Sequence, residues 1–173
     1  MEISVRNMEF DDIHILADGF GIKQGWKDKS VELFTQYYDE QSAGQRHVLV
    51  AHIGDSVAGY VTLLPNDKHG PFADKNIPTI CDFNVLKIFQ RRGVGTALMD
   101  AVEKLAKKSS NEICLGVGLY SDYGDAQRMY VKRGYIPDGS GIWYKNRNLS
   151  PYEPCANDDE LLLYMSKNFS RRA

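Results

Sequence analysis

The chain has 173 residues, with 21 Lys and Arg against 23 Asp and Glu, which gives a formal net charge of −2. This length predicts one domain, and the near-neutral charge argues against a nucleic-acid-binding protein, whose domains are usually strongly basic. The apolar runs are far shorter than the roughly 20 residues of a membrane-spanning helix, and the first residues lack the apolar core of a secretory signal. The three cysteines, Cys81, Cys114 and Cys155, have no metal-ligand spacing and favour a reduced, cytoplasmic location.

The first half of the chain predicts two helices among strands. Apolar residues at helical spacing predict a helix that Asp11 or Asp12 caps, and Ser30 is expected to cap the next helix. Alternating apolar residues on both sides of a Gly-Asp-Ser turn predict a pair of strands. The expected bounds are strand 1–8, helix 10–20, helix 30–39, strands 47–53 and 57–64, polar loop 65–78 and strand 79–86.

The second half alternates strands and helices more regularly. Its most regular helix carries an apolar stripe, and Gly134 is expected to end the helix that follows. The expected bounds are helix 94–106, strand 113–117, helix 125–133, strand 134–144, loop 145–159 and strand 160–167. This order of elements predicts an α/β or α+β fold with a mixed sheet in one domain.

A glycine-rich turn, Gln90–Thr96, stands between a predicted strand and a predicted helix. Gly93 and Gly95 let an anion approach the backbone closely, and the first N–H groups of a helix have no partner within it. Arg91 and Arg92 add positive charge, so the turn predicts a phosphate site; the alternative is an ordinary helix start with solvated arginines. The spacing matches neither GxxxxGKS/T nor GxGxxG, which argues against a nucleotidase and a dinucleotide dehydrogenase.

Two short motifs occur in order, about 30 residues apart. The first is formed by Gln90, Arg91, Arg92, Gly93, Val94 and Gly95. The second is formed by Ala126, Met129, Tyr130, Lys132, Gly134 and Tyr135. Together with the order of the flanking elements over nearly the whole chain, they resemble the GNAT superfamily of acyl-coenzyme A-dependent N-acetyltransferases. The end of the chain, 157–167, is also similar to the ending of many bacterial members.

The resemblance implies a single N-acetyltransferase domain over 1–173, with a GNAT-like mixed sheet of about seven strands and about four helices packed on both faces. It also implies acetyl-CoA as co-substrate, with Val85 as the main contact of the pantetheine arm. The pyrophosphate would bind the turn residues Gln90, Arg91, Arg92, Gly93, Val94, Gly95 and Thr96. Nothing in this scheme needs a metal.

The implied reaction is direct attack of a primary amine on acetyl-CoA in a ternary complex, and the implied catalytic residues are Tyr130 and Asp82. Tyr130 matches the tyrosine that serves the departing thiolate, although full proton transfer is uphill by about 1.5 pKa units in water; the alternative is a core tyrosine. Asp82 is expected to share a strand face with Asn84, and acts either as the base or as a structural anchor. Thr79 stands where some members have a glutamate base, and Tyr123 stands where many have a pantetheine-binding asparagine.

The acceptor site is expected on the variable segments of the chain. They are 19–26 with Trp26, the loop 65–78, and the connection with Trp143, Tyr144 and Tyr152. Asp158, Asp159 and Glu160 would attract a cationic amine, the alternative being a solvated lead-in to the last strand. The sequence does not distinguish among polyamine, aminoglycoside, amino acid and peptide acceptors.

Two other interpretations compete with a catalytic one. The first is a catalytically inactive acyl-CoA-binding sensor or interaction module. The second is a nucleic-acid-binding domain that uses Arg91 and Arg92, against which the acidic balance argues. Neither a nucleic acid nor a membrane is an expected partner. A homodimer is conceivable, because an exposed final strand would offer an edge for pairing across a two-fold axis.

Overall fold

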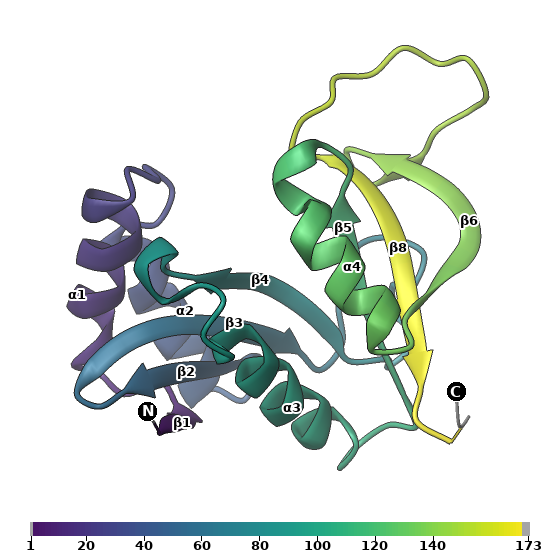
Figure 1. The fold of residues 1–173 in the computed structure, drawn as a ribbon. Coiled ribbons are helices and arrows are strands. Elements are labelled where there is room, and N and C mark those ends of the chain that lie inside the picture. The colour runs from purple at the N-terminus through teal and green to yellow at the C-terminus, as the bar shows by residue number, and fades with distance from the viewer. Residues whose placement is uncertain (1, 171–173) are drawn as a thin grey trace. The chain divides into compact units, whose positions relative to one another are not determined.

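The computed structural model describes residues 2–170, whose strands form one mixed sheet in the order β1-β2-β3-β4-β5-β8-β6-β7 (Figure 1). The strands are β1 (Ile3–Asn7), β2 (His47–Ile53), β3 (Ser56–Leu64), β4 (Thr79–Val85), β5 (Glu112–Gly118), β6 (Ile136–Tyr144), β7 (Arg147–Asn148) and β8 (Leu161–Asn168). The α-helices are α1 (Asp12–Leu16), α2 (Val31–Ser42), α3 (Val94–Ala106) and α4 (Gly124–Lys132). The shorter helical segments are the π-helix η1 (Ala17–Lys23) and the 3₁₀ turns η2 (Lys87–Phe89) and η3 (Ser121–Tyr123).

The chain divides into two compact units. The first unit contains the residues up to Pro65 together with Cys81–Leu105, and the second contains Asn66–Ile80 together with the chain from Ala106 onward. Strand β4 therefore contributes its first two residues to the second unit and the rest to the first. The expectation of a single domain stays a prediction.

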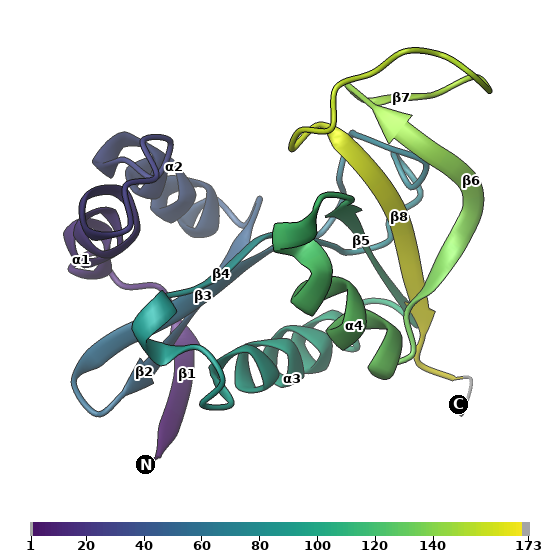
Figure 2. The same cartoon turned by 45° about the horizontal axis from the view of Figure 1, so that its top comes forward.

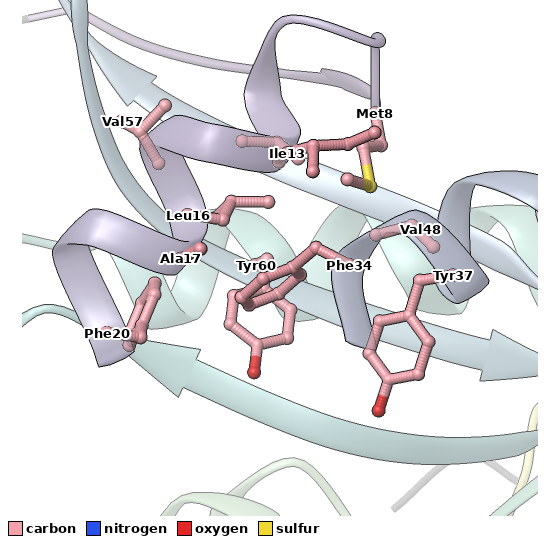
Figure 3. Close-up of a cluster of buried hydrophobic side chains, with 11 residues drawn as sticks. Met8, Ile13, Leu16, Ala17, Phe20, Phe34, Tyr37, Val48, Val57 and Tyr60 are labelled. Atoms are coloured by element: carbon pink, nitrogen blue, oxygen red, sulfur yellow. The ribbon is translucent and has the colours of Figure 1, made fainter. Parts of the chain in front are cut away.

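In the first unit, α1, η1 and α2 cover one face of β2 and β3 (Figures 1 and 2). Alternate strand residues point into this layer because successive side chains of a strand face opposite sides of the sheet. The buried cluster, most of it labelled in Figure 3, consists of Met8, Ile13, Leu16, Ala17, Phe20, Phe34, Tyr37, Val48, Val50, Val57 and Tyr60.

The opposite face of the same strands is covered by α3 (Figure 2). The predicted apolar stripe is confirmed, since Val94, Leu98 and Val102 are buried on this helix. The Leu98 side chain reaches the backbone of β3 at Gly59, where a Cβ atom would lie 3.2 Å from it. The first unit is thus a sheet layer between two helical layers.

In the second unit, β8 pairs with β5 on one side and with β6 on the other, both antiparallel. The final strand is therefore interior, and the idea that it offers a free edge for a homodimer is wrong. The strand begins with five consecutive apolar residues, Leu161–Met165, and its burial does not follow a simple alternation. The homodimer itself stays a prediction.

A second buried cluster lies in this unit, formed by Phe72, Cys114 and Tyr164. Burial raises the pKa of the Cys114 thiol to about 12, so this cysteine is an inert core residue. Cys81 is half-buried and Cys155 is exposed, and none of the three cysteines forms a disulfide.

The expected elements are found with small shifts. Ser30 caps α2 as predicted, its hydroxyl accepting the N–H of Leu33 at 3.3 Å, and Gly134 follows α4 with a φ of +88°. At the start of the first helix Asp11 makes no side-chain cap, whereas Asp12 accepts the Glu9 N–H at 2.8 Å and two hydrogen bonds from Arg6, at 2.6 and 2.9 Å.

Two local features were not expected. The first predicted helix changes after Leu16 into the π-helix η1, and the loop 145–159 contains β7. Strand β7 forms because Lys145 and Asn146 both adopt positive φ, 50° and 59°, which turns the chain back onto β6. The sheet of the described residues is mixed, as expected, with eight strands where about seven were expected. No helix within residues 2–170 is long and apolar enough to cross a bilayer.

Candidate active site

The turn before α3 leads into a helix whose first backbone N–H groups have no acceptor within it. Arg91 and Gly93 adopt positive φ, 60° and 88°, so the chain turns sharply into the helix. The first helical hydrogen bond runs from the Ala97 N–H to the Gly93 C=O, at 3.0 Å. Three N–H groups precede it, those of Val94, Gly95 and Thr96. These groups have no acceptor within the helix and lie at the positive end of its dipole.

Some of the expected ligands in the turn are better suited to bind a phosphate than others. Arg91 and Arg92 are exposed, and the Arg92 guanidinium lies 5.7 Å from the centre of the Phe89 ring. The N–H of Gln90 already donates to the Lys87 C=O at 3.3 Å, so it is the weakest of the expected ligands. Arginine cations beside a helix N-terminus are an arrangement that binds anions in many proteins.

Val85, the expected pantetheine contact, is the last residue of β4. Its C=O accepts a hydrogen bond from the Gln90 side chain at 3.3 Å, and the next N–H, that of Leu86, donates to Ala58 at 2.9 Å. A pantetheine amide that paired with the Val85 C=O would therefore replace the Gln90 amide. Strand β4 pairs with β5 in parallel through Thr79 and Ile80, both in the second unit.

Asp82, in the middle of β4, is the most highly connected side chain of the candidate site. Its Oδ1 accepts from Lys29 Nζ at 2.7 Å and from Asn84 Nδ2 at 2.7 Å. Its Oδ2 accepts from the hydroxyls of Tyr37 and Tyr60, both at 2.9 Å. A carboxylate has about four lone-pair positions, so all of them are in use. Asp82 and Asn84 share one face, as expected.

The backbone of β4 is strained where it presents this carboxylate. Asp82 has a φ of +41°, which is rare for a residue with a side chain and costs of order 1–3 kcal/mol. The preceding C=O, that of Cys81, accepts the Thr62 hydroxyl at 2.9 Å. Figure 3 shows the hydroxyls of Tyr37 and Tyr60 on the same side of the buried cluster. The two rings therefore hold the carboxylate from within the apolar layer.

Both tyrosines are kept neutral by this arrangement. Burial and the negative charge of Asp82 raise the pKa of Tyr37 well above its ordinary value. The pKa of Tyr60, whose side chain is fully buried, is raised for the same two reasons. The hydroxyls are therefore donors to the carboxylate over the whole physiological pH range.

Lys29 closes the cluster from the loop between η1 and α2. Burial lowers its pKa, but the charges and hydrogen bonds of Asp82 and Asp28 outweigh that effect, so the pKa is raised and the ammonium stays charged. The backbone that carries Lys29 packs against Gly21, where a Cβ atom would lie 2.3 Å from the Lys29 C=O. Only glycine permits this approach, so Gly21 helps to position the ammonium.

Tyr130, the expected thiolate partner, lies on α4 in the second unit. Its side chain is 6% exposed and packs edge-on against Tyr135, with ring centres 5.7 Å apart. Burial raises the pKa of the phenol, which makes complete proton transfer to a thiolate less favourable than it is in water. The residue is suited to donate a hydrogen bond rather than to release its proton.

The expected acceptor segments differ in their roles. Trp26 stacks on Phe20, with ring centres 5.8 Å apart, and packs against the buried apolar cluster of the first unit. Tyr152 is fully exposed, whereas Trp143 packs against Tyr164 in the core of the second unit. From the acidic run, Asp159 accepts hydrogen bonds from two tyrosine hydroxyls at 2.6 and 2.8 Å.

The two hydroxyls that donate to Asp159 belong to Tyr120 and Tyr123. Tyr123, which stands where many family members have asparagine, covers Gly118, where a Cβ atom would lie 2.3 Å from its ring. Among the residues that the structure describes, no three metal-ligating side chains lie together.

The sequence analysis missed three members of the Asp82 cluster, Lys29, Tyr37 and Tyr60. Tyr37 and Tyr60 looked like ordinary core residues of a helix and a strand, and most of each ring is indeed in the core. Lys29 stands in a polar loop in which lysines are usually solvated. Its position directly before the helix cap Ser30 was the one local hint that its backbone is fixed.

Comparisons with known proteins agree with the fold. The sequence matches the Acetyltransferase (GNAT) family over residues 10–135, well over half of the chain. Comparison with curated proteins gives no match.

Three solved structures illustrate the likeness of fold. An aminoglycoside 6'-N-acetyltransferase complexed with coenzyme A has a TM-score of 0.68 at 16% identity, covering 100% of this chain and 99% of that one. A spermidine N-acetyltransferase SpeG chimera from Vibrio cholerae and hSSAT has a TM-score of 0.71 at 14% identity, covering 98% of this chain and 97% of that one. The PaiA N-acetyltransferase from Thermoplasma acidophilum, in complex with coenzyme A, has a TM-score of 0.65 at 18% identity, covering 97% of this chain and 99% of that one. At these identities the structures show a common fold, and it is the family match that identifies the chain: it belongs to the GNAT family of acetyltransferases.

Proposed function

We propose that the chain, as one domain over 1–173, transfers an acetyl group from acetyl-CoA to a primary amine by direct attack in a ternary complex. The observation that carries this proposal is the exposed turn before α3, where three helix N–H groups stand beside two arginines. The family match supports a single domain because residues 10–135 include parts of both units. Three free thiols support a cytoplasmic location.

The co-substrate is proposed to bind along β4 and the turn. The N–H groups of Val94, Gly95 and Thr96 and the guanidinium groups of Arg91 and Arg92 would bind the pyrophosphate. The backbone of Val85 would bind the pantetheine arm, and the N–H of Gly93 would support the phosphate. Gln90 would act through its side chain, by releasing the Val85 C=O. Acetyl-CoA supplies the acetyl group as an activated thioester, and no metal is required.

Asp82 and Tyr130 are proposed as the catalytic residues, and their roles are argued separately because they belong to different units. As the N–C bond forms and the C–S bond breaks, the amine nitrogen releases a proton, for which Asp82 is the proposed acceptor. The sulfur leaves as a thiolate, to which Tyr130 donates a hydrogen bond. The raised pKa of Tyr130 favours this role over complete proton transfer.

The acceptor is proposed to be a small-molecule amine. Two of the similar structures are named for spermidine and aminoglycoside acetylation, and both substrate classes are cationic amines. A carboxylate that already binds an ammonium group, Asp82 with Lys29, is suited to such a substrate. A peptide amine is the alternative.

A thermal melt tests the co-substrate. At about 100 times the dissociation constant, a ligand that binds the native state adds about 2.7 kcal/mol, which corresponds to a rise of roughly 5–10 °C. We expect this rise with acetyl-CoA and with CoA but not with NADH. Equal melting temperatures with acetyl-CoA, CoA and NADH would refute the phosphate-binding role of the turn.

A turnover assay separates the enzyme from an inactive acyl-CoA-binding module. Release of CoA thiol is followed with a panel of polyamines, aminoglycosides and amino acids at saturating acetyl-CoA. Acceptor-dependent release is expected with at least one cationic amine. A protein that binds CoA in the melt but releases no thiol with any amine would be the binding module instead.

A further inference from the structure

An ammonium group is already bound at the proposed base. Lys29 Nζ lies 2.7 Å from Asp82 Oδ1, with the two side chains 12% and 15% exposed. The carboxylate is fixed by three neutral donors, Tyr37, Tyr60 and Asn84. Since all five residues lie in the first unit, this ammonium site is complete within it.

We propose that Lys29 is an internal occupant of the acceptor site, which an incoming primary ammonium replaces on Asp82. The inference rests on the proposed function and deepens it, because it names the group that the acceptor must displace. The acceptor class that fits is an unbranched alkylammonium, since the lysine side chain is itself an ammonium on an alkyl chain.

Lys29 has a second partner ready to receive it. Its Nζ also lies 3.1 Å from Asp28 Oδ2, and the Asp28 side chain is 71% exposed. A short movement of the ammonium toward Asp28 keeps it paired while it leaves the half-buried cluster. The acceptor ammonium then restores the charge balance at Asp82, so neither carboxylate is left buried and unpaired.

The exchange also explains how Asp82 acts as a base. In the free protein its four lone-pair positions are occupied, and none of them is open to a substrate proton. When the acceptor replaces Lys29, the fourth position faces the nitrogen that is to be acetylated. Lys29 is therefore a specificity-determining residue: only a cation that competes with it gains access to the base.

Chemical rescue with n-butylammonium tests the exchange without knowledge of the natural acceptor. Butylammonium is close to the side chain that Lys29→Ala removes, and it should bind the vacated carboxylate. We expect the melting temperature of Lys29→Ala to rise saturably with butylammonium chloride, by about 5–10 °C at 100 times the dissociation constant, relative to equal NaCl. Lys27→Ala, two residues away and exposed, is the matched control and should respond no more than the unaltered protein.

The double variant Lys29→Ala with Asp82→Asn should lose the response. Equal responses in all variants, or none in Lys29→Ala, would overturn the proposal. Should Lys29→Ala fail to fold in NaCl, Lys29→Gln provides a second variant, because its amide keeps a donor for Asp82. Since butylammonium must displace this neutral amide, a smaller but still saturable rise in the melting temperature is expected there, and the same melting temperature in the two salts would overturn the proposal.

Acetylation of n-butylamine gives an independent kinetic readout. Removing an internal competitor raises the fraction of protein competent to bind, so KM for butylamine should fall about ten-fold in Lys29→Ala relative to Lys27→Ala. An unchanged KM would contradict the exchange. Failure of the proposed function is seen separately: a protein that responds to butylammonium but not to acetyl-CoA refutes acetyl transfer, and the reverse result refutes only the exchange.

Discussion

Burial, rather than distance, is expected to decide the strength of the ion pair between Lys29 and Asp82. The pair is 2.7 Å long with side chains 12% and 15% exposed, whereas Lys23 and Asp18 form a pair of 2.6 Å with side chains 72% and 46% exposed. A hydrogen bond to a charged group is worth about 1.5–3 kcal/mol when it is shielded from water, and an exposed ion pair about 0.2–1 kcal/mol. The two pairs therefore form a matched comparison within one unit of the chain.

The perturbation is a double-mutant cycle on each pair. Asp82→Asn leaves the Lys29 ammonium with Asp28 as its remaining carboxylate. The free energy of unfolding should therefore fall by about 2–4 kcal/mol, somewhat less than when a buried ion pair is broken and the remaining charge has no other partner. Lys29→Met removes one of four donors to Asp82 and should cost about 1–3 kcal/mol. The coupling energy expected for the buried pair is about 1.5–3 kcal/mol.

Urea denaturation at pH 7 measures the free energy of unfolding of each variant from the midpoint and the slope. The cycle Lys23→Met with Asp18→Asn should give a coupling energy below about 1 kcal/mol. The reasoning would be refuted if the variants of Lys29 and Asp82 were additive within about 0.5 kcal/mol, which is the behaviour of independent sites. Equal coupling in both pairs would refute the role of burial.

Three further predictions concern the reaction and its pH dependence. Tyr130→Phe should lower kcat by about 10–100-fold with little change in CoA affinity, because a hydrogen bond to the thiolate is lost; Tyr152→Phe, at a fully exposed site, is the control and should leave kcat unchanged. Arg92→Ala should weaken CoA binding about five-fold in calorimetry, and less at high salt, since the guanidinium is exposed; a salt-independent loss would contradict an electrostatic role. Because the pKa values of Tyr37 and Tyr60 are raised in the folded protein, their contribution to stability is complete below pH 10 and is lost as the pH rises further. Denaturation should show no fall from this cause between pH 8 and 10. Between pH 10 and 11 the free energy of unfolding should fall by up to about 1.4 kcal/mol per pH unit for each tyrosine, and by less in Tyr37→Phe; a flat profile there would contradict the burial of these hydroxyls.

The elements of the fold were largely predictable because their signals are local. The spacing of apolar residues along Val94–Ala106, the cap at Ser30 and the glycine after α4 each act within a few residues of the chain. The missed features depend on distant partners. The final strand was expected to be exposed, but β8 lies between β5 and β6.

The candidate site also combines a local feature with one that depends on residues far apart in the sequence. The turn proposed to bind phosphate is a continuous segment, so glycines and arginines at fixed spacing are enough to single it out in the sequence. By itself, the sequence determined the helices, most strands and this turn, because hydrophobic periodicity, capping and glycine conformations are decided by neighbouring residues. The surroundings of Asp82 were decided only by the tertiary structure. Its partners Lys29, Tyr37 and Tyr60 are 53, 45 and 22 residues away along the chain, and they meet because packing of α2 and β3 against β4 brings their polar ends to one carboxylate.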